Sequence, residues 1–283
     1  MPAPETRPQE IDPRRFHDFE HAGWQRAAGN YDRYFGSLTS QAIAPLLDAV
    51  GPAGANGTSQ LLDIAAGPGY VSADAARRGW SVTGIDFSES MLALARHNFP
   101  HISFQLGDAE ALPFADASFD AAVMNFGILH LARPEAALRE ACRVLRPGGR
   151  FAFSVWATPD QTRGFKTVLD AVAEFGDPNV VLPAGPPFFR FSDPEESRRA
   201  LESAGFVDSR IRPVPLVWRI DSAADFFEAF LKGSARTGGL LNAQPPDALA
   251  EIRAAVEQRI AAFARGPRLE IPMPALIASG QKQ

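Results

Sequence analysis

A glycine-rich segment in the first third of the chain has the residue types that let a backbone approach a bound molecule closely. Residues 61–70 read Leu-Leu-Asp-Ile-Ala-Ala-Gly-Pro-Gly-Tyr. The pattern predicts a strand, a turn at Gly67 and Gly69, and a helix that begins near Tyr70 and offers its first N–H groups to an anionic group. No Gly-Lys-Ser/Thr follows, which excludes a triphosphate loop. Tight packing of the strand against the helix explains the two glycines equally well.

Two acidic residues stand where the next two predicted strands end. Asp86 ends the first of these strands, and a carboxylate there can accept hydrogen bonds from both hydroxyls of a ribose. Its alternative role is to cap the following helix, which Ser88 can do instead. Asp108 follows the second strand and can accept from an adenine amino group, while the N–H of Ala109 meets a ring nitrogen. As an isolated residue, Asp108 can equally be an ordinary loop acid.

These residues must be positioned by elements that alternate along the chain between strand and helix. The expected strands are Gln60–Ile64, Ser81–Ile85, Ile102–Gln105, Phe119–Asn125 and Arg150–Trp156. The expected helices are Tyr70–Arg78, Ser88–His97, Pro134–Leu145, Lys166–Phe175 and Pro194–Ala204. Such alternation is typical of a parallel sheet with helices on both faces. The predicted fold class is α/β: a doubly wound, mostly parallel, Rossmann-like sheet with an N-terminal helical cover and a helical lid inserted in the C-terminal half.

Composition and periodicity divide the chain into successive segments. They are a disordered tail over 1–15, an N-terminal helical cover over 16–50, a cofactor-binding core over 51–160, a lid segment over 161–190, a continuation of the core over 191–220, a helical lid over 221–267 and a final core strand over 268–283. Within the cover, Gly36 and Ser37 predict a break, followed by a helix over Leu38–Val50. A strand interrupted by Pro213 and Pro215 is expected over Asp208–Ile220, and the last strand over Pro274–Ser279.

Composition excludes several classes of protein. The chain has 283 residues, and 28 Lys and Arg against 33 Asp and Glu give a net charge of −5. Because this balance includes no basic stripe, we expect no nucleic-acid partner. The single cysteine, Cys142, excludes an internal disulfide framework, and no cluster has metal-ligand spacing, so we expect no metal. Without a bilayer-spanning apolar run or a signal-peptide pattern, we expect a soluble, cytoplasmic protein.

The chemistry-bearing features fall together at the ends of successive elements of one predicted sheet. They are Asp63, Gly67, Gly69, Asp86, Asp108 and the turn Pro147-Gly148-Gly149. In this conjunction the sequence resembles the class I S-adenosylmethionine-dependent methyltransferases, within them the small-molecule subgroup of the ubiquinone/menaquinone methyltransferases. The resemblance is specific over Leu61–Trp156 and weaker over Pro194–Phe206. It implies S-adenosylmethionine as the cofactor and a small-molecule methyl acceptor as the partner.

The resemblance, carried over residue by residue, implies two groups of cofactor-binding residues. Around the methionine end it implies Asp63, Ala65, Gly67, Gly69, Asn125 and Phe126, with Tyr31 as an aromatic cover from the N-terminal helix. Around the nucleoside it implies Asp86 on the ribose hydroxyls, Phe87 and Met91 along the pocket, Asp108 on the adenine amino group and Ala109 as a backbone donor. Ala65 departs from the glycine that is commoner at its position.

Methyl transfer from a sulfonium is an in-line displacement, which a dry and closed pocket favours. A general base is needed only when the acceptor arrives protonated. His130 follows the fourth predicted strand, and a histidine side chain suits the role of a base near neutral pH, so it is the candidate base, with a packing role as its alternative. Other candidates, or else solvated surface residues, are found on the N-terminal helix: His17, Asp18, His21 and Asp32.

The aromatic residues of this chain are unusually apolar, with 21 Phe against 3 Tyr and 4 Trp. We therefore expect an apolar or aromatic acceptor. The rings expected to bind it, or else to pack between lid and sheet, are Trp24, Phe188, Phe226, Phe227 and Phe230. An acidic acceptor would instead meet basic side chains that are otherwise expected on the surface: Arg163, Lys166, Arg190, Lys232 and Arg236. Whether oxygen, nitrogen or carbon is methylated stays open.

Two other functions are compatible with parts of this pattern. A nicotinamide-dependent (NAD or NADP) oxidoreductase also has a glycine turn and an acid after its second strand. Here, however, Ala65 and Ser72 stand where its G-x-G-x-x-G fingerprint has glycine. A non-catalytic regulatory protein that binds S-adenosylmethionine is the other alternative, because methyl transfer requires no obligatory residue. A homodimer is also left open.

Overall fold

A central sheet organises the molecule, whose computed structural model describes residues 11–54 and 58–283. Its strands run in the spatial order β3-β2-β1-β4-β5-β10-β6. Their bounds are β1 Gln60–Ile64, β2 Ser81–Asp86, β3 Ser103–Leu106, β4 Phe119–Asn125, β5 Leu145–Trp156, β6 Phe206–Val214 and β10 Ala275–Lys282. The pairs from β3 to β5 are parallel, whereas β10 is antiparallel to both of its neighbours. The predicted doubly wound, mostly parallel sheet is therefore confirmed.

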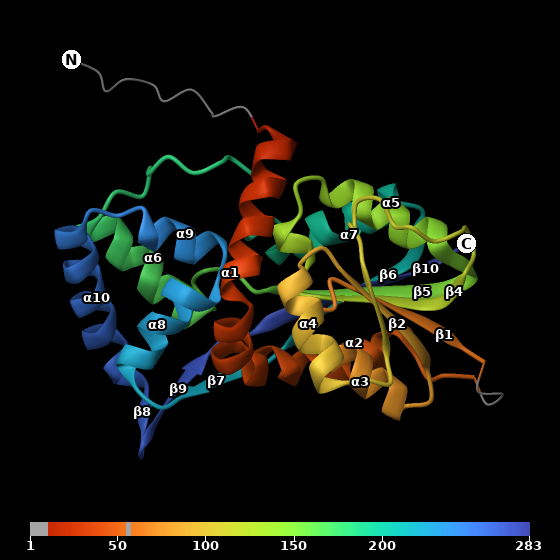
Figure 1. Cartoon of the computed structure of the whole chain (residues 1–283), viewed down its shortest axis with the longest axis horizontal. Coiled ribbons are helices and arrows are strands. Elements are labelled where there is room, and N and C mark those ends of the chain that lie inside the picture. The colour runs from red at the N-terminus through yellow and green to blue at the C-terminus, as the bar shows by residue number, and fades with distance from the viewer. Residues whose placement is uncertain (1–10, 55–57) are drawn as a thin grey trace.

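Helices cover both faces of this sheet (Figure 1). One face carries α2 Ile43–Val50, α3 Tyr70–Arg77 and α4 Glu89–Asn98, and the other carries α5 Pro134–Val144 and α7 Pro194–Ser203. Because successive strand residues point to opposite faces, neighbouring apolar residues join different cores. Leu61 packs with Leu46 and Val71 of α2 and α3, whereas Leu62 packs with the cluster that includes Leu138 of α5. This double burial explains the continuous apolar runs of the central strands.

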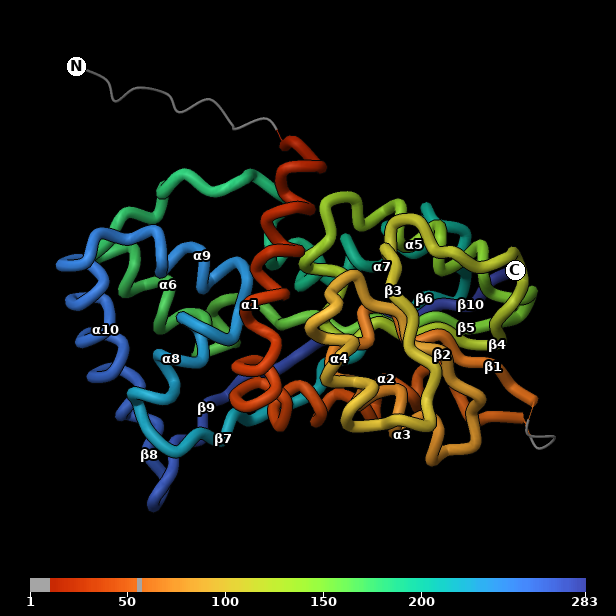
Figure 2. Tube along the Cα trace, viewed as in Figure 1, coloured from red at the N-terminus to blue at the C-terminus, as the bar shows by residue number. Residues whose placement is uncertain are grey.

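A second group of elements lies beside the sheet (Figures 1 and 2). Its helices are α6 Arg163–Phe175, α8 Ala223–Gly233, α9 Arg236–Asn242 and α10 Pro246–Ile260. Its small sheet has the order β7-β9-β8, with β7 Val217–Ile220, β8 Ala264–Arg265 and β9 Arg268–Pro272. The long helix α1, Pro13–Thr39, runs between this group and the main sheet and contacts α8 on one side and α4 on the other. The site described below lies under α1.

The helix α1 differs from the prediction at both ends. Asp12 caps its start, accepting hydrogen bonds from the N–H groups of Arg14 and Arg15, so the expected disordered tail over 1–15 is wrong for 13–15. Residues 1–10 of that tail lie outside the described residues. The predicted break at Gly36 is also wrong, because the helix continues through it. A Cβ at Gly36 would lie 3.3 Å from the ring of Tyr70, so this glycine serves close packing.

The segment over 208–220, expected as a strand interrupted by Pro213 and Pro215, forms two strands that belong to different sheets. β6 ends at Val214 and pairs with β10 in the main sheet, whereas β7 begins at Val217 and pairs with β9 in the small sheet. The prolines at 213 and 215 mark this change of sheet, since proline cannot donate a ladder hydrogen bond. None of the described helices is long and apolar enough to cross a bilayer.

Candidate functional site

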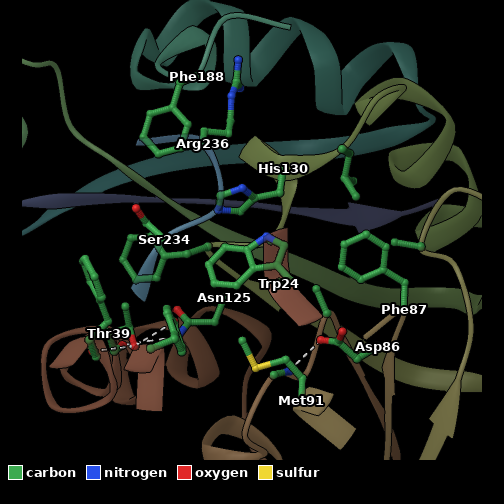
Figure 3. Close-up of a pocket in the computed structure, with 18 of the residues that line it drawn as sticks. Trp24, Thr39, Asp86, Phe87, Met91, Asn125, His130, Phe188, Ser234 and Arg236 are labelled. Carbon is green, nitrogen blue, oxygen red and sulfur yellow. Dashed lines mark hydrogen bonds between the residues drawn. The ribbon is translucent and has the colours of Figure 1, made fainter. Parts of the chain in front are cut away.

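A pocket opens at the carboxyl ends of the parallel strands, where the chain order of the sheet reverses, beneath α1 (Figure 3). It holds about 1050 Å³ of empty space, its open mouth included. One face of α1 forms a wall of the pocket through residues that recur at helical spacing: His17, Trp24, Tyr31, Phe35 and Thr39. The floor and walls come from the turns after β1 to β4, and from α9. A pocket at this position of an open α/β sheet is typical of small-molecule sites.

The turn after β1 has three residues in the left-handed region: Ala65 at φ 56°, Gly67 at φ 52° and Gly69 at φ 87°. Gly67 lines the pocket, and a Cβ there would meet nothing within 4 Å. Gly69 begins α3 away from the pocket, where a Cβ would lie 2.8 Å from the ring of Phe104. Gly67 therefore leaves open space for a ligand, whereas Gly69 serves the packing of the turn.

Asp86 joins this turn to the end of β2. Its Oδ2 accepts a hydrogen bond from the N–H of Gly67 at 2.8 Å, and its Oδ1 accepts from the N–H of Ser88 at 2.8 Å. Ser88 itself caps α4 by accepting from the N–H of Met91, so capping does not require Asp86. Burial raises the pKa of Asp86 to about 6. The carboxylate lines the pocket and is placed to accept further hydrogen bonds there.

Asp63 lies behind the turn rather than in the pocket. It is fully buried, and its Oδ2 accepts a hydrogen bond from Ser72 Oγ at 2.6 Å. Its Oδ1 has no hydrogen-bond partner in the described part of the chain, and burial raises the pKa of Asp63 to about 7. The structure therefore ties Asp63 to the first turn of α3, and does not bring its side chain to the pocket wall.

The end of the pocket nearest β2 and β3 is lined by Phe87, Met91, Asp108 and Ala109. Asp108 Oδ1 accepts from the N–H of Glu110, and its side chain is 37% exposed. His17 also lines this end, with its Nε2 3.6 Å from Asp108 Oδ2. His17 therefore faces the pocket, although its side chain is still 34% exposed.

The part of the pocket between α1 and the ends of β1 and β4 is lined by Tyr31, Ala65, Asn125 and Phe126. Asn125 is fixed from two sides, accepting from Ser154 Oγ at 2.6 Å and donating to the Thr39 carbonyl at 3.3 Å. The Tyr31 hydroxyl donates to Thr39 Oγ1, and burial raises the pKa of Tyr31 to about 12. These hydrogen bonds hold the polar groups of this part in place before any ligand binds.

His130 lies in the middle of the pocket, between Trp24 below and Phe188 and Arg236 above (Figure 3). Its Nδ1 is 3.0 Å from Oε2 of Glu20, which is fully buried on α1. Arg236 lines the same wall, with its Nε 3.7 Å from Glu20 Oε1. The sequence analysis did not select Glu20. The sequence feature that could have indicated Glu20 is an acidic residue within the apolar face of α1, between Phe16 and Trp24.

The expected acceptor-binding rings separate into two groups. Trp24 and Phe188 line the pocket. Phe226, Phe227 and Phe230 do not, because α8 turns them into the core, where each is at most 1% exposed. Phe230, for example, packs edge-on against Phe35 and Phe165. Three rings that were not predicted from the sequence line the pocket instead: Phe35, Trp156 and Phe165.

Of the five basic residues considered for an acidic acceptor, Arg236 is the one that lines the pocket. The other four, Arg163, Lys166, Arg190 and Lys232, do not line this pocket. Three of them pair with carboxylates elsewhere, as Lys166 does with Asp170 at 3.0 Å. Arg236 is 20% exposed, and burial lowers its pKa.

The charge around the turn suits a cationic ligand without phosphate. Asp86, Asp108 and Glu110 line that end, and no lysine is found among the pocket-lining residues that the structure describes. Within the described ranges, no group of three or more His, Cys, Asp or Glu side chains is placed to hold a metal ion. The unpartnered Oδ1 of Asp63 adds a further buried acceptor behind the turn.

Comparison with known proteins agrees with this geometry. A family model described as "Methyltransferase domain" matches residues 62–153. A demethylmenaquinone methyltransferase from Corynebacterium kroppenstedtii is 35% identical over 157 residues, which cover 52% of this chain and 67% of the relative. The chain belongs to the class I S-adenosylmethionine-dependent methyltransferases. The suspected family is thereby confirmed.

Other members of the family match shorter regions. A demethylmenaquinone methyltransferase from Beutenbergia cavernae is 44% identical over 113 residues, or 40% of this chain and 46% of the relative. A ubiquinone/menaquinone biosynthesis C-methyltransferase from Bradyrhizobium diazoefficiens is 43% identical over 149 residues, or 50% of this chain and 57% of the relative. This chain thus spans about half the length of several curated methyltransferases that it matches.

Solved structures show the same methyltransferase fold over more of the chain. The YcgJ protein from Bacillus subtilis has a TM-score of 0.55 and 19% identity, and the match covers 86% of this chain and 98% of that one. A phosphoethanolamine N-methyltransferase 2 from Haemonchus contortus, solved with S-adenosyl-L-methionine, has a TM-score of 0.57 and 19% identity, with 95% of this chain and 60% of that one covered. At these identities the likeness concerns the fold alone.

Proposed function

We propose that this protein is an S-adenosylmethionine-dependent methyltransferase that moves a methyl group by in-line displacement onto a small apolar or aromatic molecule. The observation that carries the proposal is one continuous pocket with two differently lined ends. Carboxylates and a glycine turn line one end, near Asp86, and aromatic rings line the other, near Phe188. A cofactor and an acceptor can thus meet within one enclosed space. Membership of the methyltransferase family supports the same function.

Within this proposal the cofactor lies along the turns after β1, β2 and β3. When bound, it supplies an electrophilic methyl group on a sulfonium. Asp86 accepts hydrogen bonds from the ribose hydroxyls, Asp108 accepts from the adenine amino group, and Ala109 offers its N–H, with Phe87 and Met91 beside the nucleoside. Gly67, Ala65, Asn125, Phe126 and Tyr31 surround the methionine end, while Asp63 and Gly69 hold the turn from behind. The carboxylates near Asp86 can accept hydrogen bonds from hydroxyl and amino groups, which supports this orientation.

The acceptor end excludes water and orients the substrate. Trp24 and Phe188 form walls on either side of His130, and Phe126 stacks on Trp156 with ring centroids 4.1 Å apart. Charge disperses as the methyl group is transferred from a sulfonium, so an apolar enclosure favours the transition state over the ground state. Positioning alone can supply much of the rate. This end therefore favours an apolar or aromatic acceptor.

Calorimetric titration with S-adenosylmethionine, its demethylated product and NADH tests the cofactor assignment. We expect micromolar binding of the first two and none of NADH, whereas binding of NADH alone would favour the oxidoreductase alternative. Incubation with methyl-labelled cofactor and cell extract, followed by mass spectrometry, tests turnover. A bound cofactor without any labelled product would favour the regulatory alternative. Two further points stay predictions: a cytoplasmic location and the absence of a nucleic-acid partner. Whether the protein forms a homodimer stays open.

A further inference from the structure

Glu20 places a carboxylate where burial makes its charge energetically unfavourable. Its side chain is fully buried under α1, and Oε1 has no hydrogen-bond partner in the described part of the chain. An isolated buried carboxylate destabilises a fold by several kcal/mol unless charge and hydrogen bonds compensate it. Two groups compensate here: His130 Nδ1, 3.0 Å from Oε2, and Arg236 Nε, 3.7 Å from Oε1. The packing of α1 alone does not require an acid at this position.

The contacts of Arg236 hold its charge beside Glu20. Its Nη1 donates to the carbonyl oxygens of Leu129 and Pro186, at 3.3 Å and 3.0 Å. Its guanidinium also lies over the rings of Phe16 and Phe188, 5.0 Å and 5.5 Å from their centroids. A guanidinium stays protonated throughout the physiological range. Glu20 therefore faces a permanent cation, with Arg236 Nε 3.7 Å from Oε1, and this cation compensates the charge of a carboxylate.

An ionised Glu20 determines which nitrogen of His130 carries the proton. A carboxylate only accepts hydrogen bonds, so Nδ1 must donate to Oε2. In the neutral imidazole this leaves Nε2 with a free lone pair. His130 lines the pocket, is 15% exposed, and its Nε2 has no protein partner among the residues that the structure describes. The pocket thus presents a proton acceptor whose tautomer is fixed from behind.

We propose that Glu20 positions His130 as a general base, and that the acceptor consequently carries an ionisable hydroxyl on an aromatic or enolic carbon. This inference rests on the proposed methyltransferase function. The rings around His130 suit a flat, conjugated acceptor, since Trp24 and Phe188 lie with centroids 4.7 Å and 5.8 Å from the imidazole. Arg236 on the same wall disfavours an ammonium and favours an acceptor that becomes an oxyanion. An aliphatic alcohol is far less acidic than a phenol and would match an imidazole base poorly.

The step balances without a further reactant. The acceptor's O–H bond breaks, and its proton moves to His130 Nε2. The electron pair left on the conjugated oxyanion forms the bond to the methyl carbon, while the methyl–sulfur bond breaks and sulfur retains its pair. Where the attacking atom is the conjugated carbon, the hydrogen on that carbon is then lost to solvent. The imidazolium that forms is stabilised by the Glu20 carboxylate. The charged side chains that surround this imidazolium from the packed helices are Glu20 of α1 and Arg236 of α9.

The test uses the full chain, methyl-labelled S-adenosylmethionine and a panel of phenols and enols that differ in acidity. Glu20→Gln keeps the shape of the side chain but removes the negative charge that fixes the tautomer, and His130→Gln removes the base. We expect both variants to lower kcat by about 10²- to 10⁴-fold with acceptors that are protonated at the assay pH. The loss should shrink at least tenfold with nitrophenol-type acceptors that are already ionised. The exposed residues Glu251 and His101 supply matched controls, Glu251→Gln and His101→Gln.

Cofactor binding separates the possible failures. Calorimetry should give each variant the wild-type affinity for S-adenosylmethionine within about threefold, which also shows that it folds; Glu20→Asp is the second variant should Glu20→Gln not fold. An equal loss of kcat across acceptors of all acidities, or no loss, would overturn the base assignment. Cofactor binding with methylation of amines or thiols only, or of no panel member, would overturn the acceptor class. Absence of cofactor binding in the wild type would instead overturn the proposed function.

Discussion

The backbone N–H of Gly67 donates a hydrogen bond to Asp86 Oδ2, with 2.8 Å between the two atoms. This contact ties the turn after β1 to the end of β2, so a carboxylate at the pocket wall also shapes the glycine turn. The N–H of Ala66 donates to the carbonyl of Ile85 at 3.0 Å and adds a second link between the same two segments. The cofactor end of the pocket is therefore largely built before a ligand arrives, which lowers the ordering cost of binding.

Replacing Asp86 tests this arrangement directly. We predict that Asp86→Ala weakens S-adenosylmethionine binding by about 10²-fold or more, because two hydrogen bonds to a charged group are lost at about 1.5–3 kcal/mol each. Isothermal titration calorimetry measures the change. Glu89→Ala, at an exposed carboxylate in the first turn of α4, is the matched control and should bind normally. Normal binding by Asp86→Ala would show that the ribose lies elsewhere.

The pH dependence of cofactor binding follows from the same residue. Burial raises the pKa of Asp86 to about 6, so the carboxyl becomes protonated as pH falls through 6 rather than through 4. A protonated carboxyl accepts fewer hydrogen bonds, and we expect the affinity for cofactor to fall by up to about tenfold per pH unit below 6. Asp86→Asn, already weaker, should lack this step. The same slope in both proteins would assign the titration to a group other than Asp86.

Ala65 offers a prediction about stability. It adopts φ 56°, in the left-handed region that costs a non-glycine residue about 1–2 kcal/mol. Ala65→Gly removes that strain but adds about 0.5–1 kcal/mol of unfolded-chain entropy. We therefore expect its free energy of unfolding to be unchanged or up to about 1 kcal/mol higher in urea titrations. Ala66→Gly, one residue later and without a positive φ, should lose about 1 kcal/mol. A clear loss in both variants would contradict the strain argument.

Two phenylalanines distinguish core from pocket. Phe230 is fully buried, and Phe230→Ala should lower the free energy of unfolding by about 3–5 kcal/mol. Phe188 is only partly buried and lines the pocket, so Phe188→Ala should cost less stability. It should instead raise KM for the acceptor by about tenfold or more through lost apolar contact, with cofactor affinity unchanged. Thermal unfolding and acceptor titrations give the two readouts, and an unchanged KM would remove Phe188 from the acceptor site.

Local sequence predicted the parts of the molecule that local chemistry determines. The central strands follow from apolar runs between turns, and the carboxyl ends of parallel strands necessarily bring Asp86 and Asp108 to one edge of the sheet. The roles of Phe230 and Phe188 could not be separated, because an apolar pattern indicates burial but not whether a ring meets the core or a cavity. The pairing of Glu20 with Arg236 was also out of reach. It depends on how α1 and α9, far apart in the sequence, pack against each other.

Asp63 gives the last prediction, and it concerns the protein without ligand. Burial raises the pKa of Asp63 to about 7, whereas an unfolded aspartate titrates near 4. Between these values the folded chain binds a proton that the unfolded chain releases, so the free energy of unfolding should fall as pH rises from about 4 to about 7, by up to about 1.4 kcal/mol per pH unit. Asp63→Asn removes this contribution and should flatten the curve over that range. Asp120→Asn is a control in which the pKa shift has the opposite sign. Hydrogen bonds from Gln60 and Arg146 lower the pKa of Asp120, so its contribution to the free energy of unfolding is lost only at more acid pH. Urea titrations from pH 4 to 8 measure the three curves, and parallel curves for wild type and Asp63→Asn would show that Asp63 is ionised in the fold.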